Sequence, residues 1–392
     1  MAVDGGVPAM ERRADAFVFV LAVVFALYVR YAFRDFFTSD FTEYTSLWYA
    51  AVQSQGLAAA GTSVSNYTPP YLYLLYLTSL ALPKVAPVMA IKVPSVAFDF
   101  VCAFFVHRIV ALKYPGGRQP WFAFLAVLLA PSVVCNSSVW GQADSIYTAM
   151  LLACVYFLMS GRAAFAMAAF GLAFSIKFQT MFLAPALAAL WCKRVIPLWS
   201  FFLVPAVYVL AMIPAWLVGR PAVELASVYL TQSGTYHVLT KNAPNVYAWL
   251  PEGYYSVLVI AGLLTMVAIA CFYIWSVWKS RVAMSPEIIL RLCLLSLIMT
   301  PFFLPKMHER FFYPADVLAI AYGFYFPKQY YVPVAIGFAS FFSYQFFLLH
   351  RTILPLQLLS LVMFAALAAV ALAARSSLNS GQAAAESRSA IC

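Results

Sequence analysis

The feature of this chain that most limits its possible folds is a succession of long apolar runs, separated by short polar turns, from about residue 16 to residue 374. Hydrophobic residues make up 65% of the sequence and charged residues only 10%, so there are too few polar side chains to cover a water-soluble globule. In lipid, backbone groups must pair within the spanning structure, which leaves helices or a closed barrel. The runs lack the alternation of polar and apolar residues that barrel strands need. The sequence therefore predicts an all-α, polytopic helical membrane protein.

A spanning helix needs roughly 20 mostly apolar residues, and about twelve segments reach or approach that length. They are residues 16–33, 88–110, 121–138, 144–160, 163–176, 178–191, 195–217, 254–278, 286–304, 311–326, 330–349 and 353–374. The stretch 71–82 is too short to span between Pro70 and Pro83, so we expect an interfacial helix there, within a first outer loop at 34–87. The short segments 163–176 and 178–191 could be two spans or one broken helix.

Basic residues set the orientation of such a chain, because cytoplasmic loops are enriched in Lys and Arg. A cytoplasmic N-terminus at residues 1–15 places three basic turns inside: Lys113 with Arg118, Lys193 with Arg194, and Lys279 with Arg281. Residues 16–374 then form a single membrane-embedded domain, and the Ala- and Ser-rich tail 375–392 is expected to be disordered and cytoplasmic. Because the basic residues are scattered between apolar runs, the net charge of +10 does not indicate a nucleic-acid partner.

With this orientation, the unusual polar segments fall on the outer side. They are SDFTEYTSLW (39–48), NYTPPYLYLLY (66–76), NSSVWGQADS (136–145), SIKFQ (175–179), KNAPNVYAWLP (241–251) and PKMHER (305–310). An ionisable group at membrane depth costs about 2.5–3.5 kcal/mol on insertion scales, so a gathering of such groups at one boundary indicates a functional site.

Two carboxylates in the first outer loop are candidates for acid–base chemistry. Asp40 and Glu43 are three residues apart and share one face if the segment is helical. Glycosyl transfer with inversion needs one carboxylate to accept the proton of the attacking hydroxyl, while a second could orient acceptor or sugar hydroxyls. Either residue could instead cap a short loop helix.

The turn PKMHER offers cations for a phosphate. Lys306, His308 and Arg310 alternate along it and could contact a monophosphate or a diphosphate, with Glu309 fixing His308 or Arg310. The alternative is a positively charged flank of a span, although such flanks belong on the inner side. A single His-Glu pair, with no second His four residues on, is not a zinc protease motif.

Further residues on the outer side are candidates for binding a sugar or an acceptor. They are Tyr67, Trp140, Gln142, Asp144, Lys177, Gln179, Asn242 and Asn245. Asp144 could equally cap the helix that follows it, Lys177 could extend its amine to the surface, and the two asparagines could be turn formers. Inside the span 88–110, Asp99 needs a partner, which could be Lys92 on the same helix face or a group on another helix.

Taken in order from about residue 36 to residue 316, these motifs resemble those of the membrane-embedded GT-C glycosyltransferases. The chain is most similar to bacterial relatives of the second mannosyltransferase of GPI-anchor assembly, and more distantly to the dolichol-phosphate-glucose glucosyltransferases. WGQADS and MHERFFYP carry most of the resemblance, whereas the first motif reads DFTE instead of a GDYEA-like form. The resemblance implies that Asp40 is the catalytic base, that residues 308–310 face the lipid-linked phosphate, and that the WGQAD segment lines the sugar pocket.

The expected function is therefore inverting transfer of a hexose, mannose before glucose, from a polyprenyl-phosphate donor to a hydroxyl of a glycan, lipid or protein. No cofactor is required, although Asp40 and Glu43 could hold a divalent metal. The expected location is a bacterial inner membrane with a periplasmic active site, or alternatively the endoplasmic reticulum with a lumenal one. A secondary transporter and a ligase or polymerase with diphosphate-linked substrates are the alternative functions, although the chain has no convincing internal repeat of the kind transporters show.

Overall fold

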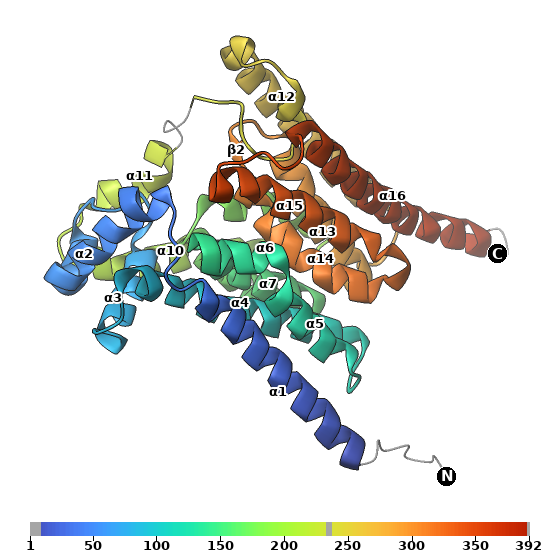
Figure 1. The fold of residues 1–392 in the computed structure, drawn as a ribbon. Helices are drawn as coiled ribbons and strands as arrows, with labels where there is room; N and C mark the ends of the chain where they lie inside the picture. The colour runs from blue at the N-terminus through green and yellow to red at the C-terminus, as the bar shows by residue number, and fades with distance from the viewer. Residues whose placement is uncertain (1–8, 233–236, 390–392) are drawn as a thin grey trace.

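The computed structural model describes residues 9–232 and 237–389, and within them the chain is almost entirely helical (Figure 1). The α-helices are α1 (Ala9–Ala32), α2 (Ser46–Gln55), α3 (Pro69–Ala81), α4 (Pro87–Lys113), α5 (Gln119–Leu129), α6 (Pro131–Val134), α7 (Asp144–Met159), α8 (Ala163–Phe174), α9 (Ala184–Cys192), α10 (Leu203–Leu217), α11 (Ala222–Gln232), α12 (Tyr255–Lys279), α13 (Pro286–Phe303), α14 (Tyr313–Tyr325), α15 (Tyr331–Leu349) and α16 (Leu356–Ser389). Two short strands, β1 (Thr240–Lys241) and β2 (Met307–His308), pair in parallel.

Seven helices in the described part of the chain are long and apolar enough to cross a membrane. An eighth is gained if the bent pair Gln119–Leu129 and Pro131–Trp140 counts as one span. The pair meets at 46° because Pro131 lacks the N–H that would continue the helix. Three apolar helices, Asp144–Met159, Ala163–Phe174 and Phe178–Cys192, are shorter than a span requires. The predicted all-α, polytopic membrane fold is confirmed, and several of the twelve predicted segments are short, buried helices.

The stretch 71–82, which the sequence predicted to be an interfacial helix, is helical and too short to span a bilayer. The stretch 71–82 lies within α3, whose thirteen residues are roughly 20 Å long and fall short of the ~30 Å hydrocarbon core of a bilayer. Pro69 and Pro70 begin α3, where a missing N–H costs nothing. Helices α2, α3 and α11 gather at one end of the molecule, away from both chain ends (Figure 1).

The segment 163–191 folds into two helices that run in opposite directions. The carbonyl of Phe182, near the start of the second helix, accepts hydrogen bonds from Ser296 and Thr300 near the end of α13. At the end of the same helix, the Lys193 amine reaches the carbonyl of Ser280, which lies before the start of α13. The second helix is therefore antiparallel to α13. The alternative of one broken helix across 163–191, which would have reversed the direction of every later element, is excluded.

Contacts between turns confirm the alternation of helix directions. At one end of the bundle, Lys92 near the start of α4 donates to the carbonyls of Phe33 and Phe36 just after α1. At the other end, Lys113 and Tyr114 donate to the carbonyls of Tyr325 and Phe324. The predicted basic turns share this second end with the start of α1, since Arg118 pairs with Asp15.

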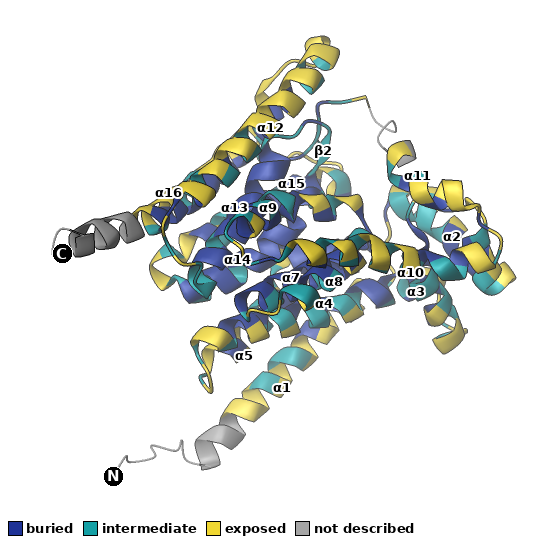
Figure 2. Ribbon diagram, turned by 180° about the vertical axis from the view of Figure 1, so that it is seen from behind, coloured by how far each residue is buried: buried dark blue, intermediate teal, exposed yellow. Residues whose placement is uncertain are grey.

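The core lies around α7, α13 and α14, whereas α1 and α12 are peripheral. Figure 2 shows α1 and α12 largely exposed, and only 11% and 17% of their most apolar windows are buried, against 78% for α13. Such exposed apolar helices are expected where lipid is the solvent. The chain is therefore an integral, multi-pass membrane protein.

Asp99 in α4 is fully buried. Of the two partners considered for it, Lys92 on the same helix or a group on another helix, the structure shows the second. Arg30 of α1 approaches within 2.8 Å of Asp99 Oδ2, and Ser137 Oγ and Tyr313 OH also donate to the carboxylate. The alternative pairing with Lys92 is wrong, because that amine caps the carbonyl end of α1 instead.

Helix α16 continues to Ser389, through most of the stretch 375–392 in which the sequence predicted disorder. Alanine-rich sequence has a high helix propensity, which explains why an apolar helix can extend into such a stretch. Residues 390–392, and residues 1–8 of the predicted cytoplasmic N-terminus, lie outside the described residues.

Candidate active site

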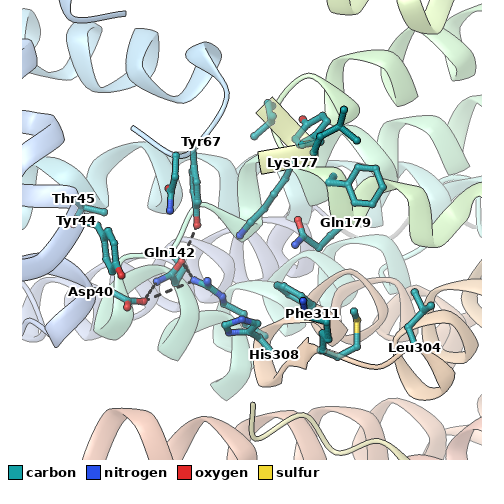
Figure 3. A pocket seen from close by; sticks show the side chains of 18 of the residues that line it. Asp40, Tyr44, Thr45, Tyr67, Gln142, Lys177, Gln179, Leu304, His308 and Phe311 are labelled. Atoms are coloured by element: carbon teal, nitrogen blue, oxygen red, sulfur yellow. Dashed lines mark hydrogen bonds and ion pairs between the residues drawn. The ribbon is translucent and has the colours of Figure 1, made fainter. Parts of the chain in front are cut away.

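A cavity of about 500 Å³ lies at the end of the bundle where the predicted outer motifs meet (Figure 3). Residues of five of the six motifs line it: Asp40, Tyr44, Thr45 and Trp48 from the first, Asn66 and Tyr67 from the second, Gln142, then Ile176, Lys177, Phe178 and Gln179, and finally Pro305, Lys306, Met307, His308 and Arg310. Tyr229, Leu230, Leu263, Leu304 and Phe311 complete the wall. The prediction that distant polar segments converge is confirmed for these residues.

Asp40 is positioned by the way the chain leaves α1. After the carbonyl end of α1, held by Lys92, the chain turns and enters a π-helical turn, Phe41–Thr45, directly after Asp40. The Oδ2 atom of Asp40 accepts hydrogen bonds from Trp140 Nε1 at 2.8 Å and Gln142 Nε2 at 2.6 Å. Both donors therefore converge on one oxygen of the carboxylate. No described residue donates to Oδ1, and the side chain is 24% exposed.

Trp140 ends a second π-helical turn, Cys135–Trp140, at the end of the bent span, and Gln142 follows two residues later. Gly141 has a left-handed backbone (φ 77°), which glycine adopts without strain, and a Cβ there would lie 3.4 Å from Lys92 Cγ. Trp140 also stacks on Phe347 of α15 with ring centroids 4.4 Å apart. π turns are rare overall but frequent at functional sites, and here one directly follows Asp40 and the other ends two residues before Gln142.

Gln142 joins the carboxylate to the cationic side of the cavity. Its Oε1 accepts from Arg310 Nη1 and, at 3.5 Å, from Tyr67 OH, while its Nε2 donates to Asp40. Arg310 Nη1 itself lies 3.9 Å from Asp40 Oδ2, and its guanidinium stands over the Trp140 ring at 5.6 Å. A carboxylate and a guanidinium therefore meet at one point of the cavity wall.

The PKMHER turn is held by backbone pairing with the loop before α12. Met307 and His308 pair with Thr240 and Lys241, and the Lys306 N–H donates to the Leu239 carbonyl at 2.7 Å. Lys306 adopts a left-handed backbone (φ 63°), uncommon for a residue other than glycine. Such pairing places Lys306, His308 and Arg310 on the same cavity wall.

Burial changes the protonation of two groups in this turn. The pKa of His308 is lowered well below its usual range, first by burial and then by the nearby charges of Arg310, Lys241 and Lys177. The imidazole is therefore neutral at pH 7. Burial raises the pKa of Glu309 to about 7, although Arg310 and Lys241 oppose the change. Glu309 is 1% exposed, and its Oε2 lacks a hydrogen-bond partner within the described chain.

Asp144 and Lys177 form an ion pair at the edge of the cavity. Lys177 Nζ lies 2.5 Å from Asp144 Oδ1, and Asn136 Nδ2 donates to the other carboxylate oxygen at 3.0 Å. Asp144 is completely buried at the first position of α7, and its carboxylate accepts from the side chains of Asn136 and Lys177. Lys177 is 6% exposed and lies over the Tyr67 ring at 5.1 Å. Asp144 therefore holds Lys177 against the cavity, and the surface position considered for Lys177 is not adopted.

Six of the predicted site residues do not line the cavity: Glu43, Trp140, Asp144, Asn242, Asn245 and Glu309. Glu43 is exposed on the π turn after Asp40. Asn242 forms a backbone bridge to His308. Asn245 is fully buried and connects three elements, because its side chain accepts from Tyr247 N, its Nδ2 lies 3.5 Å from the Pro301 carbonyl, and its own carbonyl accepts from Ser360.

Two groups of residues that line the cavity were not predicted from the sequence. Tyr44 and Trp48 follow Asp40 at intervals of four, and this helical spacing was a signal that could have found them. Tyr229, Leu230 and Leu263 form the apolar side of the cavity and lie in ordinary apolar helices, where no local signal separates them from lipid-facing residues. Within the described ranges, no group of three or more His, Cys, Asp or Glu side chains could hold a metal ion.

The chain is similar in fold to a protein of known structure. No protein-family model and no curated protein matches the sequence. The solved structure of ArnT from Cupriavidus metallidurans bound to undecaprenyl phosphate is similar, with a TM-score of 0.55 and 15% identity over 93% of this chain and 78% of that one. At this identity the likeness extends to the fold alone. The chain therefore shares its fold with ArnT, in agreement with the all-α, polytopic membrane architecture that the sequence predicted.

Proposed function

We propose that the protein is an inverting glycosyltransferase that moves a hexose from a polyprenyl-phosphate donor to an acceptor hydroxyl. The observation that carries this proposal is the composition of the 500 Å³ cavity. It combines a carboxylate (Asp40), a cation 3.9 Å from it (Arg310), a second cation in the wall (Lys306) and an apolar side. Transfer from a lipid phosphate needs these three parts together, because a base, a phosphate-binding group and a path for the lipid must meet.

The apolar wall is the proposed path of the polyprenyl chain. Leu230, Leu263 and Phe178 line the cavity and are 77%, 48% and 47% exposed, so the cavity is bordered by apolar side chains that face the lipid. A lipid tail along this wall would place its phosphate near Lys306 and Arg310, with His308 as a neutral hydrogen-bonding neighbour. The ArnT-like fold supports a lipid phosphate as ligand, since ArnT was solved bound to undecaprenyl phosphate.

The polar wall is the proposed site of the sugar. Tyr67, Gln142, Lys177 and Gln179 offer donors and acceptors there, and the Gln179 Oε1 is buried without a partner among the described residues. A sugar hydroxyl could donate to that oxygen. We favour mannose over glucose on the resemblance of the motifs, with an active site on the periplasmic side of a bacterial inner membrane.

In the proposed reaction, Asp40 Oδ1 accepts the proton of the acceptor hydroxyl. The hydroxyl oxygen attacks the anomeric carbon on the face opposite the phosphate, and the bond from that carbon to the phosphate oxygen breaks. Polyprenyl phosphate leaves with its charge stabilised by Arg310 and Lys306, and the sugar is inverted. Glu43, exposed three residues after Asp40, is limited in this scheme to contact with the acceptor.

Asp40→Asn tests the proposal. Loss of a general base typically lowers the rate by about 10²- to 10⁴-fold, so the variant should be nearly inactive while it still binds donor. The measurement is release of polyprenyl phosphate by purified protein offered polyprenyl-phosphate mannose and polyprenyl-phosphate glucose separately, with a membrane extract as acceptor source. Asp35→Asn is the matched control, because that carboxylate is 74% exposed and pairs with the exposed Arg34.

Turnover by wild type and Asp35→Asn, but not by Asp40→Asn, would support the proposal and identify the sugar. Normal turnover by Asp40→Asn would remove Asp40 as the base. Consumption of neither donor by wild type would instead favour a transporter or chemistry on diphosphate-linked lipids.

A further inference from the structure

A second cavity of about 330 Å³ lies between the first outer loop and α11. One of its lining residues is apolar, Val228, and the others are polar: Ser63, Ser65, Asn66, Arg220, Glu224 and Ser227. A hollow with this composition is unusual in a chain that is 65% hydrophobic. Its polar lining therefore points to a ligand with several polar groups.

Arg220 is the most unusual residue of this cavity. It is 5% exposed, and its Nε and Nη1 atoms have no hydrogen-bond partner within the described residues. A buried guanidinium with unmet donors is costly, because the desolvation of each unmade hydrogen bond is not recovered. An oxyanion in the cavity would supply acceptors in the paired geometry that guanidinium binds best.

Glu224 balances the charge of Arg220 only in part. Its Oε2 lies 3.8 Å from Arg220 Nε, beyond hydrogen-bond distance, and instead accepts from Ser63 Oγ at 2.7 Å. The Glu224 side chain is 48% exposed, so it can move toward solvent at little cost. The Glu224 carboxylate therefore lies where a bound anion would lie, but it does not accept hydrogen bonds from Arg220.

The elements around the cavity are held in place independently of it. Tyr208 of α10 donates to the Leu225 carbonyl of α11 at 2.7 Å, and Tyr73 of α3 accepts from Ala215 N at 2.9 Å. The second cavity also adjoins the first, since Asn66 lines both and Ser227 and Val228 directly precede Tyr229 and Leu230. A molecule that fills the second cavity can thus extend a group into the proposed site of transfer.

We infer that the second cavity is a subsite for an anionic group of the acceptor, either a phosphate ester or a sugar carboxylate, bound by Arg220 with help from Ser63 and Ser65. Its role in the acceptor rests on the proposed glycosyl transfer, whereas the binding of an anion does not. The acceptor is accordingly an anionic lipid headgroup or an acidic glycan, whose anion is anchored at Arg220 while its hydroxyl reaches Asp40.

Direct binding tests the subsite. Purified protein in detergent is titrated with glycerol 3-phosphate in one arm and D-glucuronate in the other, which distinguishes the two sources of charge. Arg220→Gln should weaken binding of the preferred probe by about 10- to 100-fold, the equivalent of losing a hydrogen-bonded charge partner. Glu224→Gln should tighten binding several-fold, because it removes a competing carboxylate.

Arg310→Ala provides the comparison with the first cavity. It should lose sugar transfer but keep binding of the probe, so failure of the proposed reaction and failure of the subsite are distinguishable. Unchanged binding by folded Arg220→Gln, or no binding of either probe by wild type and Glu224→Gln, would overturn the inference. If Arg220→Gln does not fold, Glu224→Gln alone decides: tighter binding supports the subsite, and equal or weaker binding overturns it.

Discussion

The Gln142 amide is the residue on which the geometry of the first cavity depends. It donates to Asp40 through Nε2 and accepts from Arg310 and Tyr67 through Oε1, so one planar group sets the positions of an anion, a cation and a phenol. Such a side chain acts through others, because it aligns the proposed base and the proposed phosphate-binding group. Errors of about 1 Å in alignment can cost about 100-fold in rate.

Gln142→Leu keeps the size of the side chain and removes both sets of hydrogen bonds. We expect kcat to fall by about 10- to 100-fold and the KM for donor to rise, because Arg310 also loses its partner. The measurement is steady-state release of polyprenyl phosphate. Gln357→Leu is the control, since Gln357 is exposed and donates to the Ala248 carbonyl, away from the residues that line the first cavity. Equal kcat and KM for the two variants would contradict a positioning role for Gln142.

At the scale of elements, a buried ion pair between Arg30 and Asp99 helps to attach α1 to the bundle. Most of α1 faces lipid, and the apolar face it presents adds little preference for protein over lipid tails. Arg30 instead bonds Asp99 and the carbonyls of Ala26 and Leu128, with a side chain only 3% exposed. Since α1 leads directly into the turn that carries Asp40, this pair also fixes one edge of the cavity.

Arg30→Met should lower the free energy of unfolding by about 3–5 kcal/mol, because it leaves the Asp99 carboxylate buried and unpaired. The double variant Arg30→Met with Asp99→Asn should recover part of that loss, since the uncompensated charge is then absent. Thermal unfolding in detergent compares the stability of the wild type, the single variant and the double variant. Arg34→Met is the matched control: its exposed pair with Asp35 is expected to contribute about 0–1 kcal/mol. An equal loss for both single variants would show that Arg30 has no special part in attaching α1.

At the scale of the whole molecule, the described turns divide into two sets at opposite ends of the bundle. The two cavities and the polar motifs share one end, and the basic turns share the other. A bilayer makes this division inevitable once the helices alternate, because no polar turn can rest within hydrocarbon. The positive-inside rule then predicts that the cavities face away from the cytoplasm.

Topology reporters in a bacterial host check this arrangement. Alkaline phosphatase inserted after Ser63, beside the second cavity, should be active because that position is expected in the periplasm. The same enzyme inserted after Arg118, which pairs with Asp15 at the other end, should be inactive. The reverse pattern would place both cavities in the cytoplasm, where nucleotide-activated sugars are available, and would argue against a lipid-linked donor.

The sequence predicted which turns meet at the candidate site, but some of the residues that it named do not line the cavity. Asp40, Gln142, Lys177, Gln179 and Arg310 meet in one cavity, because the alternation of spans brings every outer turn to the same end. Asn245 does not line the cavity, because it is buried in contacts with α13 and α16. This position could not be predicted from the sequence. An asparagine in a polar loop has the same local pattern whether it binds a ligand or closes a turn.

The sequence by itself determined the class of fold, the interfacial length of 71–82 and the gathering of polar motifs in one set of turns, whereas the direction of the helices after residue 163 was left open. These follow from apolar length and loop charge, which are local quantities compared with the fixed thickness of a bilayer. Only the tertiary structure decided that Asp99 pairs with Arg30, that Asp144 holds Lys177, and that Arg220 lies buried beside a second cavity. Those pairings depend on which helix faces lie together, and contacts between residues distant in sequence leave no local pattern.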